Sequence, residues 1–129
     1  MRAFRAALLR FDEQQQPVHD ADGLLVVGPG AHGRMVVQAA GDHDSLVGRF
    51  AGVPVEDLRG HLIAPGFVDL HVHYPQTDVI GSPADGLLPW LESYTFPHES
   101  RFADKAYARG VADFFFDELA RHGVTTALT

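Results

Sequence analysis

The chain has 129 residues, no Cys and a formal charge of −7, from 10 Lys and Arg against 17 Asp and Glu. The acidic balance argues against a general nucleic-acid or anionic-membrane binder, because such proteins present Lys and Arg to phosphates. The lack of Cys excludes disulfides, thiolate metal sites and a Cys nucleophile. No apolar run approaches the roughly 20 residues that cross a bilayer, and the N-terminus lacks a signal-peptide core. We therefore expect a soluble, cytoplasmic protein.

Residues 1–64 alternate short apolar runs with turn residues. Three runs predict strands: Phe4–Phe11, Leu24–Val27 and Met35–Val37. Ser45–Phe50 predicts a brief helix, with Asp44 or Ser45 as its cap. Short strands separated by Gly and Pro are typical of a small sheet or sandwich layer. We interpret residues 1–64 as a β-sandwich-like N-terminal segment.

The pattern changes after this segment. The nearly continuous apolar run Leu62–Leu70 predicts a strand that is buried on both faces, as in a parallel sheet. The stretch from Tyr74 to about Phe102 contains several Pro and Gly residues and predicts a long loop. Loops of that length are uncommon in compact domains unless they carry function.

A helix and a second strand follow the loop. Asp104–His122 has apolar residues at spacings of three and four, which predicts a helix that Asp104 caps and Gly123 ends. Val124–Leu128 predicts another buried strand. We interpret residues 65–129 as the first βαβ unit of an α/β barrel or doubly wound sheet. We expect the barrel to be incomplete in this chain, because a full (β/α)8 barrel takes about 250 residues.

His71 and His73 stand at the C-terminal end of the predicted strand Leu62–Leu70. Side chains alternate along a strand, so the two imidazoles point the same way and can reach one divalent metal ion. Asp69 shares their face and can orient a ligand. Active sites of α/β barrels form at this end of the strands. The pattern predicts a metal site, and the alternative is two surface or hydrogen-bonded histidines.

The residues around this pair resemble a known family. Pro65–His73 resembles the first-strand signature of the amidohydrolase superfamily, whose members also carry a small β-sandwich built partly from the segment before the barrel. The following residues resemble the guanine deaminase family within it, over about Gly23 to Thr129. The motifs that carry the second resemblance are His73–Gln76, Leu87–Glu92, Tyr94–Pro97 and Glu99.

The resemblance implies the hydrolysis of guanine to xanthine and ammonia with one Zn²⁺ per subunit, in a homodimer. It implies that His71 and His73 are two of the zinc ligands. In that family the remaining His and Asp ligands and the proton-shuttling Glu come from later barrel strands. We therefore assign no catalytic residue within this chain. We expect the chain to be the N-terminal part of the enzyme and to be inactive alone.

The resemblance also implies a substrate site. Gln76 matches the glutamine that hydrogen-bonds the purine, and an amide suits that task because it both donates and accepts. Tyr74 and Pro75 fall in the same substrate-contacting stretch. Trp90 lies in a segment near the pocket, and loop packing is the alternative for its side chain.

Two other readings stay open. One is a different amidohydrolase, acting on another purine, a triazine or a cyclic amide. The other is a non-catalytic fragment that folds only with a missing barrel or a partner chain. Two enzyme classes are excluded. The zinc deaminases with His-x-Glu and Pro-Cys-x-x-Cys need Cys, and a serine hydrolase of the Gly-x-Ser-x-Gly type lacks its motif here.

Overall fold

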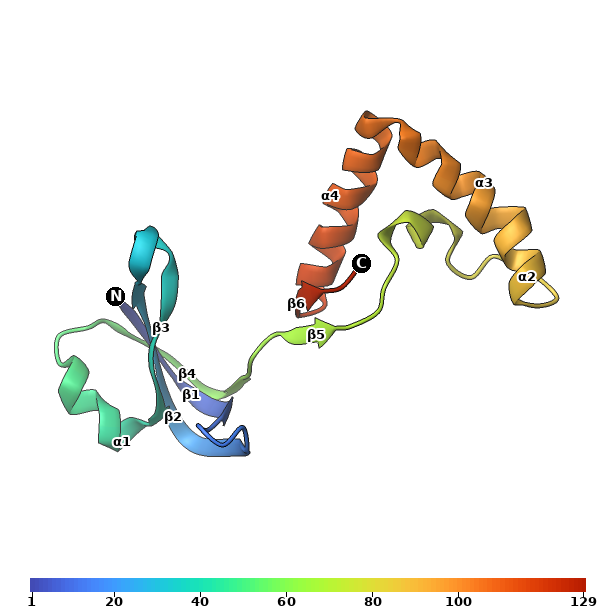
Figure 1. The fold of residues 1–129 in the computed structure, drawn as a ribbon. Helices are drawn as coiled ribbons and strands as arrows, with labels where there is room; N and C mark the ends of the chain where they lie inside the picture. Colours follow the sequence, from blue (N-terminus) through green and yellow to red (C-terminus); the bar gives the residue numbers. More distant parts are fainter. The chain divides into compact units, whose positions relative to one another are not determined.

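The computed structural model describes residues 1–129, which divide into two units, Met1–Pro65 and Gly66–Thr129. The first unit is built on a four-stranded sheet with the order β3-β2-β1-β4 (Figure 1). β1 pairs with β2 in antiparallel fashion and with β4 in parallel, and β2 pairs with β3 in antiparallel fashion. The strands are β1 (Arg2–Phe11), β2 (Pro17–Pro29), β3 (Met35–Asp42) and β4 (Val55–Ile63).

The hairpin between β1 and β2 is closed by one aspartate. The Asp12 carboxylate accepts hydrogen bonds from the backbone N–H groups of Gln14 at 2.9 Å and Gln16 at 2.8 Å. Ala3 of β1 and Leu24 and Val26 of β2 face one side of the sheet, as the period of two requires, and form the buried cluster of this unit. The buried apolar residues are Ala3, Ala6, Leu8, Leu24 and Val26.

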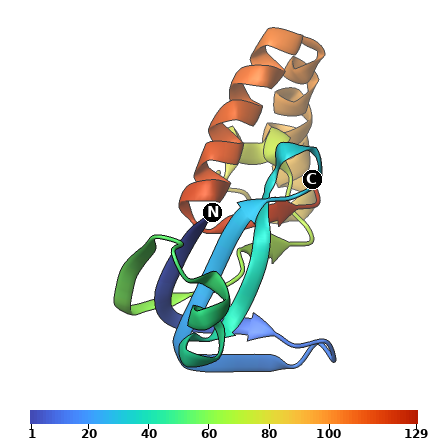
Figure 2. The same ribbon diagram turned by 90° about the vertical axis from the view of Figure 1, so that its left-hand side faces the viewer.

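The three predicted strands are confirmed, but β2 is longer than predicted. It passes without a break through Asp22 and Gly23, where Arg5 Nε donates to Asp22 Oδ1 at 2.8 Å across the hairpin. Figure 2 shows the bend of this long strand within the sheet. This ion pair joins the polar part of β2 to β1 across the hairpin.

The prediction for the brief helix is confirmed in place and wrong in its cap. The segment forms α1 (His43–Leu46) followed by a 3₁₀ turn, Val47–Phe50. Its cap is Asp42, whose side chain accepts from the backbone N–H of Ser45 at 3.0 Å. The helix begins at His43, so Asp44 and Ser45, the predicted caps, lie inside it, and Asp42 takes the cap position with non-helical backbone angles.

The second unit contains two parallel strands and a long helix between them in sequence. β5 (Phe67–Asp69) and β6 (Val124–Ala127) are parallel neighbours, and α4 (Lys105–Arg121) precedes β6. The Asp104 carboxylate caps α4 by accepting from the backbone N–H of Ala106 at 2.8 Å. Gly123 follows the helix with φ of 78°, a left-handed conformation that favours glycine. The chain is therefore a mixed α/β structure.

The single predicted strand Leu62–Leu70 is wrong in two respects. Its first residues end β4 in the first unit, and only Phe67–Asp69 form β5. Phe67 and Val68 are 69% and 58% exposed rather than buried. Within this chain β5 has β6 as its one sheet neighbour, so its apolar faces are left uncovered.

The predicted loop Tyr74–Phe102 is also wrong, because most of it is helical. It begins with η3, a 3₁₀ segment over Tyr74–Val79. A bent helix follows, visible as a continuous ribbon in Figure 1. This bent helix consists of α2 (Leu87–Trp90), a π-helical turn (Leu91–Thr95), α3 (Phe96–Glu99) and a 3₁₀ turn (Ser100–Ala103).

Proline misleads the prediction in this segment. Pro97 lies in the first turn of α3, directly after the π-helical turn, so the proline stands where the regular α-helical pattern is interrupted. Pro89 lies inside the four-residue helix α2, close to its start. None of the helices has the length and apolarity that a membrane span requires.

Candidate metal and substrate site

The site begins with two histidines at the C-terminal end of β5. The ladder between β5 and the chain after β6 continues past the assigned strands, since Leu128 N–H donates to Asp69 O at 2.9 Å and Val72 N–H to Leu128 O at 3.2 Å. These bonds hold the backbone on both sides of His71. His71 Nε2 lies 2.9 Å from His73 Nε2, and both side chains are exposed to solvent.

This nitrogen pair has the chemistry of a partial metal site. Zinc binds histidine nitrogen at about 2.0–2.1 Å, so one ion reaches two nitrogens that are up to about 4 Å apart. The observed separation of 2.9 Å lies within that limit. The chain holds no group of three or more His, Asp or Glu side chains suited to a metal ion. Zinc sites usually have three or four protein ligands, so the pair would supply two of them.

Asp69 acts on the backbone of the pair. Its Oδ1 accepts from the backbone N–H of His71 at 3.0 Å. The carboxylate therefore fixes the chain direction of His71 rather than contacting an imidazole ring. Orientation of a metal ligand by Asp69 stays a prediction.

Gln76 is tied to the histidine pair through η3. Its backbone N–H donates to His73 O at 3.1 Å, which closes the first turn of that segment. Its side-chain Nε2 donates to Glu99 Oε1 at 3.1 Å, and both residues are partly buried. The contact with Glu99 was not predicted, because no local signal joins residues that are 23 positions apart on separate helical segments.

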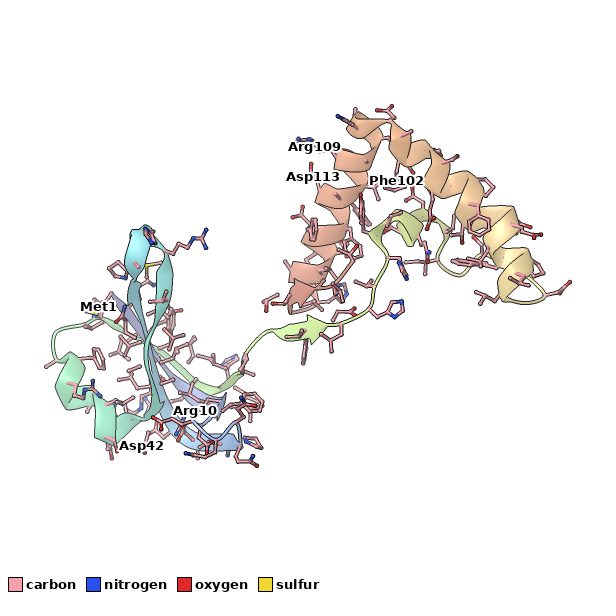
Figure 3. All side chains as sticks on the ribbon, viewed as in Figure 1. Met1, Arg10, Asp42, Phe102, Arg109 and Asp113 are labelled. Carbon is pink, nitrogen blue, oxygen red and sulfur yellow. The ribbon has the colours of Figure 1, made fainter.

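Tyr74 and Pro75 form the start of η3. The Tyr74 ring packs against Phe102 and Phe115, with centroid distances of 5.5 and 6.1 Å. Figure 3 places Phe102 in the angle between α3 and α4. The ring thus anchors η3 to the helices. Contact of Tyr74 or Pro75 with a substrate stays a prediction.

Trp90 is the last residue of α2 and is half-buried. Its backbone N–H donates to Gly86 O at 3.1 Å, and Gly86 has φ of 154°. Trp90 belongs to the same bent helix as Glu99, which contacts Gln76. Its role at a substrate pocket stays a prediction.

A second polar cluster joins η3 to the helices. Asp78 Oδ2 accepts from the Tyr107 hydroxyl at 2.9 Å and lies 3.2 Å from His98 Nε2. The hydrogen bond from Tyr107, with a further contribution from His98, lowers the pKa of Asp78 below its ordinary value. Burial and the bond to Asp78 raise the pKa of Tyr107. His98 Nε2 also lies 2.9 Å from the Tyr107 hydroxyl, so His98 contacts both Asp78 and Tyr107.

Comparison with known proteins places the chain in a family. Residues 62–129, slightly more than half of the chain, match the model of the Amidohydrolase family. The chain belongs to this family. This amidohydrolase chain is 41% identical to the guanine deaminase of Escherichia coli (strain K12) over 124 residues. The aligned residues make up 95% of this chain and 25% of that protein.

Two solved structures resemble this amidohydrolase. The guanine deaminase of Bradyrhizobium japonicum has a TM-score of 0.84 and 32% identity, covering 98% of this chain and 28% of its own. The guanine deaminase of C. acetobutylicum, solved with guanine in its active site, has a TM-score of 0.79 and 29% identity, covering 98% and 29%. The chain therefore spans about a quarter to a third of the length of these relatives.

Proposed function

We propose that the protein containing this chain is a zinc-dependent guanine deaminase that hydrolyses guanine to xanthine and ammonia. The observation that carries the proposal is the pair of nitrogens His71 Nε2 and His73 Nε2, 2.9 Å apart, with Gln76 joined to His73 by a backbone hydrogen bond. The likeness to guanine deaminases over almost the whole chain supports it.

His71 and His73 would hold the zinc ion through their Nε2 atoms. A bound zinc ion supplies a hydroxide nucleophile at neutral pH and polarises the group under attack. Asp69 holds the His71 backbone in place for this task, and the ladder to Leu128 holds the backbone between the two rings.

Gln76 would bind the purine, with Tyr74, Pro75 and Trp90 along the same pocket. One N–H of the Gln76 amide is taken by Glu99, which leaves its carbonyl oxygen and one further N–H for a ligand. An amide that is held in place before the substrate binds can orient the substrate, and orientation accounts for a large part of catalysis.

Deamination also needs a group that moves a proton to the departing amine. We assign that role to no residue of this chain, because the family resemblance implies a Glu from a later barrel strand; Asp69 bonds the His71 backbone and Glu99 bonds Gln76. The proposal is therefore that the proton shuttle and the remaining zinc ligands come from other parts of the protein, and that the 129 residues alone are inactive.

The proposal extends to architecture and setting. We interpret residues 1–64 as a β-sandwich-like segment and residues 65–129 as the first βαβ unit of a metal-dependent hydrolase barrel. The exposed apolar side chains of β5, including Phe67 and Val68, suit packing inside such a barrel. We further propose a cytoplasmic homodimer that acts on a small molecule and binds neither nucleic acid nor membranes.

The test is an assay of the complete open reading frame that includes this sequence. The purified, zinc-loaded protein should release ammonia from guanine and produce xanthine. Other aminopurines, a triazine and a cyclic amide, assayed in parallel, test the alternative that it is a different amidohydrolase. Turnover of one of those compounds with none of guanine would replace the proposal by that alternative.

A further inference from the structure

The contact between Gln76 and Glu99 decides which way the Gln76 amide faces. A side-chain amide has a donor end and an acceptor end of nearly the same shape, so a free glutamine presents either end to a ligand. At neutral pH a glutamate carboxylate is ionised and only accepts hydrogen bonds. The Gln76 Nε2 group must therefore face Glu99, as the 3.1 Å bond has it.

The opposite end of the amide is then fixed as well. With Nε2 held by Glu99, Oε1 of Gln76 is directed away from the carboxylate and is available as an acceptor. A site that presents a fixed acceptor favours ligands with an N–H at that point and disfavours ligands with a lone pair there, because two facing acceptors leave both groups unpaired.

The surrounding structure keeps this contact rigid. Gln76 lies on η3, and Glu99 is the last residue of α3. Close to this contact, Asp78 on η3 is bonded to Tyr107 of α4 and lies 3.2 Å from His98 of α3. Two neighbouring polar contacts thus fix η3 against the helices. Partial burial of Gln76 and Glu99 strengthens a charge-assisted bond relative to one in water.

We propose that Glu99 is a positioning residue that fixes the Gln76 amide with its carbonyl oxygen toward the substrate, and so makes the site selective for purines that present an N–H there. The inference rests on the proposed function. It goes further in naming a residue that acts through Gln76 and the hydrogen-bonding pattern that the site selects. Guanine has N–H groups on both rings and meets this requirement.

Three variants of the complete protein test the proposal: Glu99→Gln, Gln76→Glu and the double variant Gln76→Glu/Glu99→Gln. Glu99→Gln keeps the size of the side chain, but a neutral amide bonds to either orientation of Gln76. Gln76→Glu places two carboxylates face to face. The double variant restores the bond with its polarity exchanged, because the amide introduced at position 99 donates to the carboxylate introduced at position 76. The other oxygen of that carboxylate still offers an acceptor to the ligand.

The kinetic result separates positioning from simple support of the fold. Glu99→Gln should raise the KM for guanine about tenfold, in line with the loss of one hydrogen bond to a charged group, and change kcat less. Gln76→Glu should be impaired at least as much, and the double variant should return to within about threefold of the unmodified protein. Glu92→Gln, an exposed glutamate on the same bent helix, is the matched control and should leave KM unchanged.

Inhibition by 1-, 7- and 9-methylguanine reads out the selectivity. Each compound replaces a ring N–H or blocks a ring nitrogen, and the unmodified protein should discriminate strongly against at least one of them. That discrimination should shrink about tenfold in Glu99→Gln and reappear in the double variant.

The outcomes are distinguishable. A protein that neither binds nor hydrolyses guanine overturns the proposed function and this inference with it. An active protein in which Glu99→Gln keeps its KM and its discrimination overturns this inference alone. Impairment of Glu99→Gln without rescue in the double variant also overturns it, because that result assigns Glu99 a structural role. If Glu99→Gln does not fold, the comparison of Gln76→Glu with the double variant decides.

Discussion

His71 Nε2 and His73 Nε2 lie 2.9 Å apart at the end of β5. Without a metal ion this contact requires one ring to donate its N–H and the other to accept, so the two rings cannot both carry a proton on Nε2. The same two nitrogens converge on one point in space, which is what two ligands of a single ion must do.

Replacing either histidine should remove the metal. In the complete protein, His71→Ala or His73→Ala should lower the zinc content measured by plasma mass spectrometry to a small fraction of one per subunit. Activity should fall by at least about 100-fold, because even groups that only support a ligand cost 10- to 100-fold. His61→Ala changes an exposed histidine of β4 and should keep both zinc and activity. Full zinc occupancy in both site variants would contradict the assignment.

Gln76→Ala should weaken the binding of guanine more than the binding of other substrates. The proposed hydrogen bond from Gln76 to the purine would be lost, which should raise the KM for guanine by about 10- to 100-fold with a smaller effect on kcat. Steady-state kinetics with guanine and with any second substrate of the enzyme measures the effect. Gln14→Ala, in the hairpin turn of the first unit, serves as the control. An equal loss for every substrate would show that Gln76 does not recognise guanine.

The Asp78 cluster predicts an acid-sensitive contribution to stability. The folded pKa of Asp78 is lowered, chiefly by its bond from Tyr107, so the folded state binds fewer protons at this group than the unfolded state does. Its contribution is therefore fully present above about pH 4 and is lost as pH falls through the folded pKa. Thermal denaturation should show Asp78→Asn less stable than the unmodified protein at pH 7, with a gap that narrows below about pH 4.

Tyr107→Phe tests the same cluster from its other end. It removes the donor to Asp78, so this variant should also be less stable than the unmodified protein at pH 7. The difference in stability should again become smaller in acid. Tyr94→Phe, on the bent helix, removes a hydroxyl outside this cluster and serves as the matched control. A gap that stays constant from pH 7 to pH 3 would mean that the charge of Asp78 is not what stabilises the contact.

Gly66 allows the close approach of the chain before β5 to β6. A Cβ atom at this position would overlap the side chain of Thr125. Gly66→Ala should therefore destabilise the protein by about 1–3 kcal/mol, as overpacking usually does. Gly110→Ala, within α4 and with open space around it, should instead stabilise by about 0.5–1 kcal/mol. Chemical denaturation compares the two, and a neutral Gly66→Ala would contradict the packing argument.

Local signals account for what the sequence predicts well. The helix α4 carries its periodic apolar face, its Asp104 cap and the terminating Gly123 within one stretch, and it forms where expected. The pairing of β5 with β6 is predictable because two parallel strands need a long crossover connection, which here contains α4. Alternation along a strand predicts that His71 and His73 point the same way, and their Nε2 atoms lie 2.9 Å apart although β5 ends at Asp69. Their role as metal ligands stays a prediction.

Other features depend on contacts between distant residues. The first part of β4 was not predicted, because its residues are mostly exposed and Glu56 and Asp57 pair with arginines rather than with an apolar core. The bent helix was hidden by Pro89 and Pro97, whose effect depends on their position within a turn. The bond from Gln76 to Glu99 joins two segments whose separation no periodic pattern reports.

The ladder to Leu128 sets an order of events during synthesis. The backbone of the histidine pair is held by a residue that lies 56 positions after Val72. At a ribosomal rate of roughly 5–20 residues per second, the two histidines are made about 3 to 11 seconds before that residue. During this interval they lie on a strand without its neighbour. Helix α4 must fold and return the chain before the two imidazoles are held in place.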